Sequence, residues 1–145
     1  MRGDQAANTL AIVTMERIRI LLADDHDVLL NRILRILSRE FDVVGTASDG
    51  QMLLDETERL QPDLLVADIS MPLINGIESV RRLKESGSQV KVVFLTVHEN
   101  ADYVREAFAA GALGYVFKSR INSDLVEAIK AVHAGRSFVS PSITL

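Results

Sequence analysis

The sequence predicts an α/β fold, a doubly wound open sheet of parallel strands with helices on both faces. Five short apolar runs, rich in β-branched residues or leucine, recur at near-regular intervals along the 145 residues. Stretches with apolar residues at helical spacing separate these runs, so strand and helix alternate five times. Near-continuous apolar strands indicate burial on both faces, and strands separated by single helices run parallel with right-handed crossovers.

The elements follow one another in a regular order. The expected strands span residues 18–23, 41–46, 64–67, 90–95 and 113–117. Helical spacing is clearest in three of the intervening stretches, with apolar residues at Leu29, Ile33, Ile36 and Leu37, then Ile77, Val80 and Leu83, and finally Leu125, Ala128, Ile129 and Val132. Asn100 and Ser123 are expected helix N-caps, and Gly111 suits a helix C-terminus.

The length fits one domain with a single hydrophobic core. Residues 1–16 are polar and small with no clear period, so we expect a flexible leader. Residues 17–135 carry the alternating pattern and form the expected domain. Residues 136–145 have linker composition, including Ser140, Pro141 and Ser142.

Composition excludes several functions. A formal net charge of -4 gives no basic surface for nucleic acid, so we do not expect this segment itself to contact DNA. The chain has no cysteine, which excludes disulfides, thiolate metal sites and thiol nucleophiles. No apolar run approaches the roughly 20 residues that a membrane span needs. We therefore expect a cytoplasmic protein without membrane contact.

Polar side chains stand where the strands end. The first strand is followed by Asp24 and Asp25, the third by Asp68, the fourth ends at Thr96, and the fifth is followed by Lys118. An Asp after a strand is more often a turn former or helix cap than a ligand. Five such residues at one edge of the sheet, however, indicate a binding crevice, because open parallel sheets bind ligands outside the carboxyl ends of their strands.

The chemistry of this edge suits a divalent cation and a phosphate. Like-charged carboxylates about 4 Å apart repel by on the order of 4 kcal/mol at an effective dielectric of 20, unless a cation or protons intervene. An all-oxygen site with room for waters favours Mg²⁺, for which Mn²⁺ could substitute, over zinc or calcium. Lys118 is a mobile charge of the kind that binds phosphate, and the Thr96 hydroxyl can donate to a phosphoryl oxygen.

These motifs resemble the receiver domains of two-component response regulators, over roughly residues 17–135. The residues that carry the resemblance are Asp24-Asp25, Asp68-Ile69-Ser70-Met71-Pro72 followed by Asn75-Gly76, then Thr96, and Tyr115-Val116-Phe117-Lys118. The resemblance implies a flavodoxin-like sheet of five strands in the order 2-1-3-4-5 with five helices. It also implies that a sensor histidine kinase is the phosphodonor, and that the receiver catalyses its own phosphorylation and dephosphorylation instead of turning over a substrate.

The resemblance assigns a role to each site residue. Asp68 is the expected phosphoacceptor, and Asp25, Asp68 and the backbone carbonyl of Ser70 are expected to hold Mg²⁺. Asp24 would reach the cation through water or directly. The phosphoryl oxygens would be bound by the remaining two strand-end residues, Thr96 and Lys118.

The resemblance further predicts a conformational switch. On phosphorylation, Thr96 would move inward and the ring of Tyr115 would fill the vacated space; the alternative is a strand tyrosine with an exposed hydroxyl. The affected face would be the fourth helix, near residues 100–109, with the fifth strand and fifth helix, where a second receiver could dock as a homodimer. His98, two residues after Thr96, is expected to tune the lifetime of the aspartyl phosphate, whereas His26 is expected to be solvated and not a metal ligand.

The C-terminal residues 131–141 resemble the junction after the receiver in NarL/FixJ-type (LuxR-type) regulators, which continue into a helix-turn-helix domain. This favours a receiver separated from a transcription factor over a single-domain regulator, so DNA would be contacted only through an output domain outside these residues. Two rival functions stay open. One is a phosphate-independent pseudo-receiver, which typically lacks some of the acidic or lysine residues. The other is a phosphohydrolase of the haloacid dehalogenase type, which needs a second Asp where this chain has Ser70.

Overall fold

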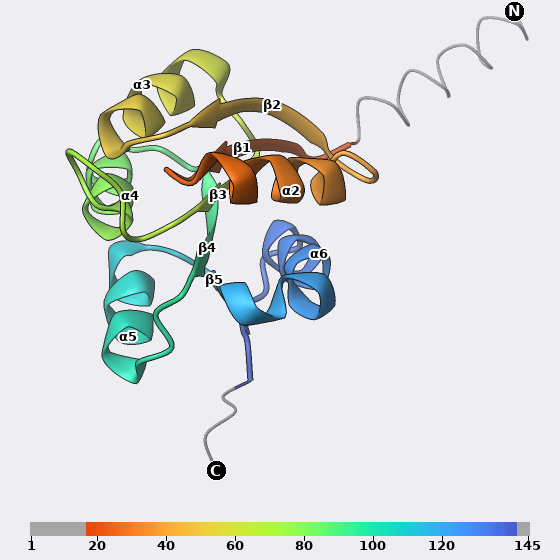
Figure 1. The fold of residues 1–145 in the computed structure, drawn as a ribbon. Coiled ribbons are helices and arrows are strands. Elements are labelled where there is room, and N and C mark those ends of the chain that lie inside the picture. The colour runs from red at the N-terminus through yellow and green to blue at the C-terminus, as the bar shows by residue number, and fades with distance from the viewer. Residues whose placement is uncertain (1–16, 142–145) are drawn as a thin grey trace, which may run out of the picture.

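The computed structural model describes residues 17–141, in which helices and strands alternate (Figure 1). The predicted leader, residues 1–16, lies outside the described residues, as do residues 142–145. The elements in chain order are β1 Arg19–Ala23, α2 Asp27–Leu37, β2 Asp42–Ala47, α3 Gly50–Leu60, β3 Leu64–Ala67, α4 Gly76–Glu85, β4 Lys91–Thr96, α5 Ala101–Ala110, β5 Gly114–Phe117, the 3-10 turn η1 Lys118–Arg120, α6 Ile121–His133 and β6 Phe138–Val139.

The sheet is parallel and its strand order is β2-β1-β3-β4-β5-β6. The predicted doubly wound fold and the order 2-1-3-4-5 are confirmed. One further strand, β6, was not predicted; it pairs with β5 at Gly114 with Phe138 and at Tyr115 with Val139. Two residues are too few to produce a recognisable strand period, which is why the sequence pattern predicts a linker at this segment.

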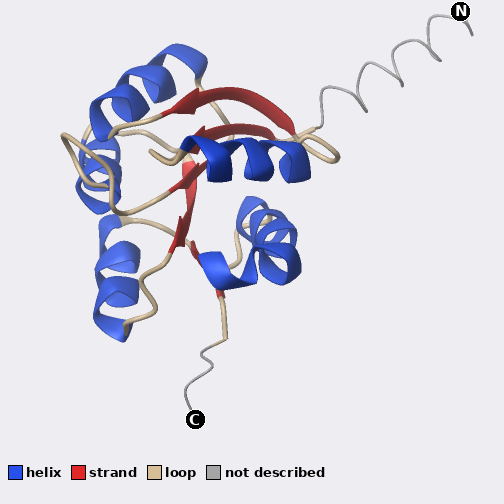
Figure 2. Ribbon diagram, in the orientation of Figure 1, coloured by secondary structure: helices blue, strands red, loops and turns tan. Residues whose placement is uncertain are grey.

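Helices cover both faces of the sheet (Figure 2). They pack on it through two separate hydrophobic layers, one on each face. Alternate residues of β1 point to opposite faces: Leu21 packs in the layer formed with α3, α4 and α5, whereas Ile20 and Leu22 pack in the layer formed with α2 and α6. The strands are therefore apolar on both sides, as the continuous apolar runs predicted. None of the helices within residues 17–141 is long and apolar enough to span a bilayer.

One of the two predicted N-caps is correct. The Asn100 side chain caps α5 by accepting a hydrogen bond from a first-turn amide, and Gly111 ends this helix with a left-handed backbone at φ 117°. The prediction of Ser123 as the other N-cap is wrong, since α6 begins about one turn before this residue. The 3-10 turn runs directly into the helix, so α6 begins at Ile121 with Arg120 in the capping position.

Candidate functional site

The carboxyl edge of the sheet brings the predicted site residues together. Backbone hydrogen bonds continue past the strand ends, since the amide of Asp24 donates to Ala47 and that of Asp68 donates to Ala23, at 3.0 and 2.9 Å. Both aspartates therefore continue the hydrogen-bond pattern of the strands, and both are buried. The parallel topology places these two carboxylates side by side although they are far apart in the sequence.

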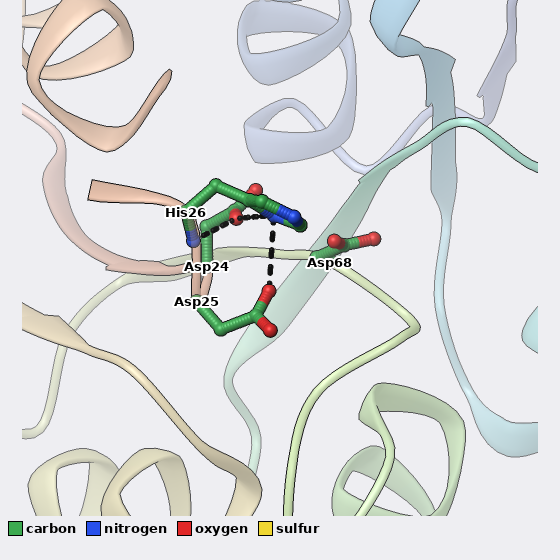
Figure 3. A group of neighbouring side chains, drawn as sticks. All are labelled: Asp24, Asp25, His26 and Asp68. Atoms are coloured by element: carbon green, nitrogen blue, oxygen red, sulfur yellow. Dashed lines mark hydrogen bonds and ion pairs between the residues drawn. The ribbon is translucent and has the colours of Figure 1, made fainter. Parts of the chain in front are cut away.

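Four side chains at this edge form a group that can hold a metal ion. Asp24, Asp25, His26 and Asp68 each offer one ligand atom, and these atoms lie within 4.8 Å of one another. Figure 3 shows the first three in a row along the loop after β1, with Asp68 opposite them. The cluster thus joins the acidic pair to the residue that follows the central strand β3.

One carboxylate oxygen in this cluster lacks a hydrogen-bond partner. Oδ1 of Asp25 is buried, and although His26 Nδ1 lies 3.1 Å away, the geometry is not that of a hydrogen bond. The same imidazole nitrogen does form a hydrogen bond with Oδ1 of Asp24, also at 3.1 Å. A buried carboxylate oxygen without a partner is costly, and coordination by a cation would satisfy it. The donor set is rich in carboxylate oxygen, as Mg²⁺ prefers.

His26 takes part in this cluster more closely than its sequence position indicated. Its side chain is 66% exposed, as expected for a solvated residue. Its backbone amide and its ring nitrogen nevertheless both contact Asp24 Oδ1, at 2.9 and 3.1 Å. The only sequence signal for this contact was the position of His26 directly after the acidic pair.

Lys118 lies between two of the carboxylates. Its ammonium nitrogen is 2.9 Å from Oδ2 of Asp24 and 2.9 Å from Oδ2 of Asp68, and its side chain is only 10% exposed. Burial alone would lower the pKa of Lys118, but the hydrogen bonds and charges of the two aspartates outweigh burial and raise this pKa. The lysine therefore stays charged and neutralises part of the acidic cluster.

A close backbone approach fixes the loop after β3. A Cβ atom on Gly76 would lie 2.1 Å from the carbonyl oxygen of Asp68, and the Gly76 amide donates to Ile69 at 2.7 Å. The Ile69 amide in turn donates to Oδ1 of Asp68 at 2.7 Å. The Asn75 side chain caps α4, so the Asn-Gly pair anchors the loop at the point where the helix begins. Only glycine fits there, which explains its place in the motif.

Thr96 and His98 form the wall of the site on the side of β4. Thr96 is completely buried, and its hydroxyl oxygen accepts a hydrogen bond from the His98 amide at 3.3 Å. The His98 ring stacks on Tyr103 with centroids 4.2 Å apart. Its Nε2 atom lies 2.8 Å from the hydroxyl of Ser70. His98 consequently links the loop after β3, the loop after β4 and helix α5.

Tyr115 is buried and lies inside the protein. The residue has no exposed surface, and its hydroxyl donates a hydrogen bond to the carbonyl oxygen of His98 at 2.7 Å. Burial raises the pKa of this phenol, with smaller contributions from Tyr103 and Asp68. The alternative of a strand tyrosine with an exposed hydroxyl is therefore wrong.

A hollow lies away from this site. It has a volume of about 940 Å³ and is found at the opposite edge of the sheet, between α3 and α4, where its lining includes Thr57, Arg82 and Lys91. None of the predicted site residues lines it. The chemistry of the chain is thus concentrated at the carboxyl edge and not in this hollow.

Comparison with the sequences of known proteins identifies a family with this site. Residues 20–130 match the response regulator receiver domain family. The transcriptional regulatory protein DegU of Brevibacillus brevis is 35% identical over 134 residues, which cover 91% of this chain and 57% of DegU. The chain thus spans less than two thirds of this curated relative.

Solved structures give the same result. A LuxR-family two-component response regulator from Aurantimonas sp. SI85-9A1 matches with a TM-score of 0.83 and 34% identity, covering 87% of this chain and 91% of that chain. The isolated REC domain of RcsB from Salmonella enterica serovar Typhimurium matches with a TM-score of 0.80 and 25% identity, covering 89% and 97%. The chain belongs to the response regulator receiver domain family, among regulators of the LuxR type.

Proposed function

We propose that this receiver accepts a phosphoryl group on Asp68 from a phosphohistidine of a sensor histidine kinase, in a reaction that depends on Mg²⁺. The observation that carries the proposal is the position of Lys118, whose ammonium bridges Asp24 and Asp68 inside the carboxylate cluster. A carboxylate nucleophile, a cation-binding group and a mobile ammonium are the parts that phosphoryl transfer needs.

The side chains have distinct roles in the transfer. A carboxylate oxygen of Asp68 attacks phosphorus, the bond from phosphorus to the donor nitrogen breaks, and its electron pair stays on the donor imidazole. Lys118 shifts from the carboxylates to a phosphoryl oxygen, and the Thr96 hydroxyl donates to another. Bound Mg²⁺, or Mn²⁺ in its place, would neutralise the charge of the transferred group, held by Asp25, Asp68 and the Ser70 backbone carbonyl, with Asp24 directly or through water.

The same site would also catalyse its own dephosphorylation. The side chains of Ser70 and His98 meet at 2.8 Å beside the site, where attacking water would enter. Stacking on Tyr103 holds the imidazole in place. We infer that this pair restricts water and so sets the lifetime of the aspartyl phosphate.

Phosphorylation would be transmitted through Thr96 and Tyr115. Both contact the backbone of His98, the hydroxyl of Thr96 at its amide and the hydroxyl of Tyr115 at its carbonyl oxygen. Movement of Thr96 toward a phosphoryl group would therefore shift the segment that Tyr115 holds. The surface above it, formed by α5, β5 and α6, is where a second receiver would dock as a homodimer.

The proposed output is control of transcription through a separate DNA-binding domain. DegU is named a transcriptional regulatory protein, and RcsB forms dimers bound to DNA. Because the chain spans 57% of DegU, residues 17–135 would be the receiver and residues 136–145 would lead toward that output domain. The cytoplasmic location stays a prediction from the sequence.

Intact mass spectrometry tests the proposal. The protein is incubated with Mg²⁺ and acetyl phosphate, and Asp68→Asn is compared with Asp102→Asn, which changes an exposed aspartate on α5. We expect a phosphoryl-sized mass gain in the wild type and the control, its loss in Asp68→Asn, and its reversal by hydroxylamine. A folded, Mg²⁺-bound wild type without any gain, and without binding of the phosphomimetic BeF3−, would instead support a pseudo-receiver. Steady hydrolysis of a phosphate ester would support a phosphohydrolase.

A further inference from the structure

A buried serine near the end of the described chain is bonded to the strand that precedes Lys118. Ser140, which directly follows β6, is 2% exposed. Its amide donates to the carbonyl of Tyr115 at 2.9 Å, and its hydroxyl oxygen accepts from the amide of Phe117 at 3.1 Å. β6 ends at Val139, and directly after it the serine side chain accepts the hydrogen bond of a β5 amide.

The hydroxyl of Ser140 also donates to a buried carboxylate on α6. Asp124, 4% exposed, accepts this bond at 2.7 Å and accepts another from Nε of Arg120 at 2.7 Å. Arg120 is the last residue of the 3-10 turn that begins at Lys118. One carboxylate thus fixes the backbone before Lys118, through Ser140 and Phe117, and the side chain that closes the turn after it.

We propose that Ser140 and Asp124 are positioning residues for Lys118, so that the C-terminal segment 138–141 completes the phosphoryl-binding site. The inference rests on the proposed function, in which Lys118 moves from Asp24 and Asp68 to a phosphoryl oxygen. A lysine side chain is long and flexible, so the position of its ammonium nitrogen is well defined only if its backbone is firmly held. Segment 138–141 contains β6, the edge strand of the sheet, which pairs with β5 near the C-terminal end of the described chain (Figure 1).

The coupling works in both directions. If docking of the segment places Lys118, then movement of Lys118 toward a phosphoryl group changes the strength of docking by the same free energy. The hydrogen bond from Phe117 to Ser140 lies one residue from Lys118 and is the first contact to respond. The docked segment would then report the phosphorylation state to whatever chain follows it.

Ser140→Ala tests the positioning role, with Thr57→Val as the matched control. Both changes remove a buried hydroxyl, but Thr57 bonds only within α3, to Leu53, and lines the hollow at the opposite edge of the sheet. We expect the rate of Asp68 phosphorylation by acetyl phosphate to fall about tenfold in Ser140→Ala, since displacing a reacting group by ~1 Å can cost on the order of 100-fold. Calorimetric titration should give an Mg²⁺ dissociation constant within about twofold of wild type, because the oxygen ligands lie in other loops.

The outcomes separate the possible failures. A rate equal to wild type in Ser140→Ala, or an equal loss of rate in Thr57→Val at a similar melting temperature, would overturn the positioning role and leave the proposed function intact. A parallel loss of Mg²⁺ affinity would show general loosening of the site and would also overturn it. A wild type that is never phosphorylated would overturn the proposed function and this inference together.

A measurement on the wild type covers the case in which Ser140→Ala does not fold. Amide hydrogen exchange at Phe117 and Ser140 is compared with Mg²⁺ alone and with Mg²⁺ and beryllofluoride. We expect exchange at both amides to change at least about threefold on beryllofluoride binding, which corresponds to roughly 0.65 kcal/mol. Unchanged exchange at both amides, with beryllofluoride bound, would overturn the inference.

Discussion

Lys118 and Asp68 form an ion pair of 2.9 Å although 50 residues separate them in the chain. The same ammonium contacts Asp24, so a single positive charge partly neutralises the three carboxylates of the cluster. The lysine therefore holds the site together before any cation binds, and it is also the group that is proposed to bind the phosphoryl oxygens.

Lys118→Met removes this charge and keeps most of the volume. We expect the free energy of unfolding without Mg²⁺ to fall by about 1–3 kcal/mol, the usual cost of leaving a buried polar partner unpaired. Mg²⁺ should recover more stability in the variant than in the wild type, because the cation replaces the missing positive charge. Thermal unfolding with and without Mg²⁺ measures both effects.

Lys130→Met is the control for this change. Lys130 pairs with Glu40 on the surface, where both side chains are about half exposed, and such pairs contribute only about 0–1 kcal/mol. If Lys118→Met were as stable as Lys130→Met, or responded to Mg²⁺ as the wild type does, the stabilising role of the ammonium would be refuted.

Tyr115→Phe removes the hydroxyl that donates to His98 and keeps the buried ring. We expect a loss of about 0.5–1.5 kcal/mol of stability, typical of one hydrogen bond, and a phosphorylation rate close to that of wild type. Hydrogen exchange in residues 97–103 should become faster and should no longer respond to beryllofluoride, because the loop has lost its link to β5. A normal response to beryllofluoride in this variant would show that the hydroxyl does not carry the coupling.

His98→Ala removes the ring that meets Ser70 and stacks on Tyr103. We expect the aspartyl phosphate to hydrolyse about 3–10 times faster, equivalent to roughly 0.7–1.4 kcal/mol of barrier, because water then enters the site more easily. The loss of phosphorylated mass with time measures this rate. His133→Ala, at the far end of α6, serves as the control, and equal rates in the two variants would reject a role for His98.

Much of the site could be predicted because its residues stand at the ends of uninterrupted apolar strands. Once the strands are parallel, Asp24, Asp68, Thr96 and Lys118 must meet at one edge, whatever the loop lengths. The sequence pattern therefore predicted which side chains gather there. It also indicated which metal would suit them, although not how the individual atoms pair.

The remaining features of the fold and the site could not be predicted, because they depend on very short elements or on contacts between residues far apart in the sequence. The start of α6 was misplaced because a 3-10 turn precedes it, and strand β6 was missed because it has two residues. The bond between Ser70 and His98 spans 28 positions, and the bond between Ser140 and Asp124 spans 16. No local sequence motif predicts the hydrogen-bond partner of either serine, so only the three-dimensional structure reveals these pairs.

The pH dependence of stability should contain a contribution from Asp124. Burial alone would raise the pKa of this carboxyl, but hydrogen bonds from Arg120, Ser140 and Ser123 outweigh burial and lower it below its usual value. A pKa that is lower in the folded than in the unfolded state means that the unfolded chain binds the proton more readily. The carboxylate therefore stabilises the fold above its unfolded pKa of about 4, and this stability is lost as the pH falls through the lower, folded pKa.

Asp124→Asn removes that contribution without changing the size of the side chain. We expect urea unfolding at about pH 7 to show a loss of roughly 1–3 kcal/mol, and the difference from wild type to shrink as the pH falls below about 4. Asp102→Asn, at an exposed position on α5, should change stability by less than about 0.5 kcal/mol at either pH. A difference between Asp124→Asn and wild type that stayed constant or widened on acidification would contradict the lowered pKa, because only the ionised form accepts all of these hydrogen bonds.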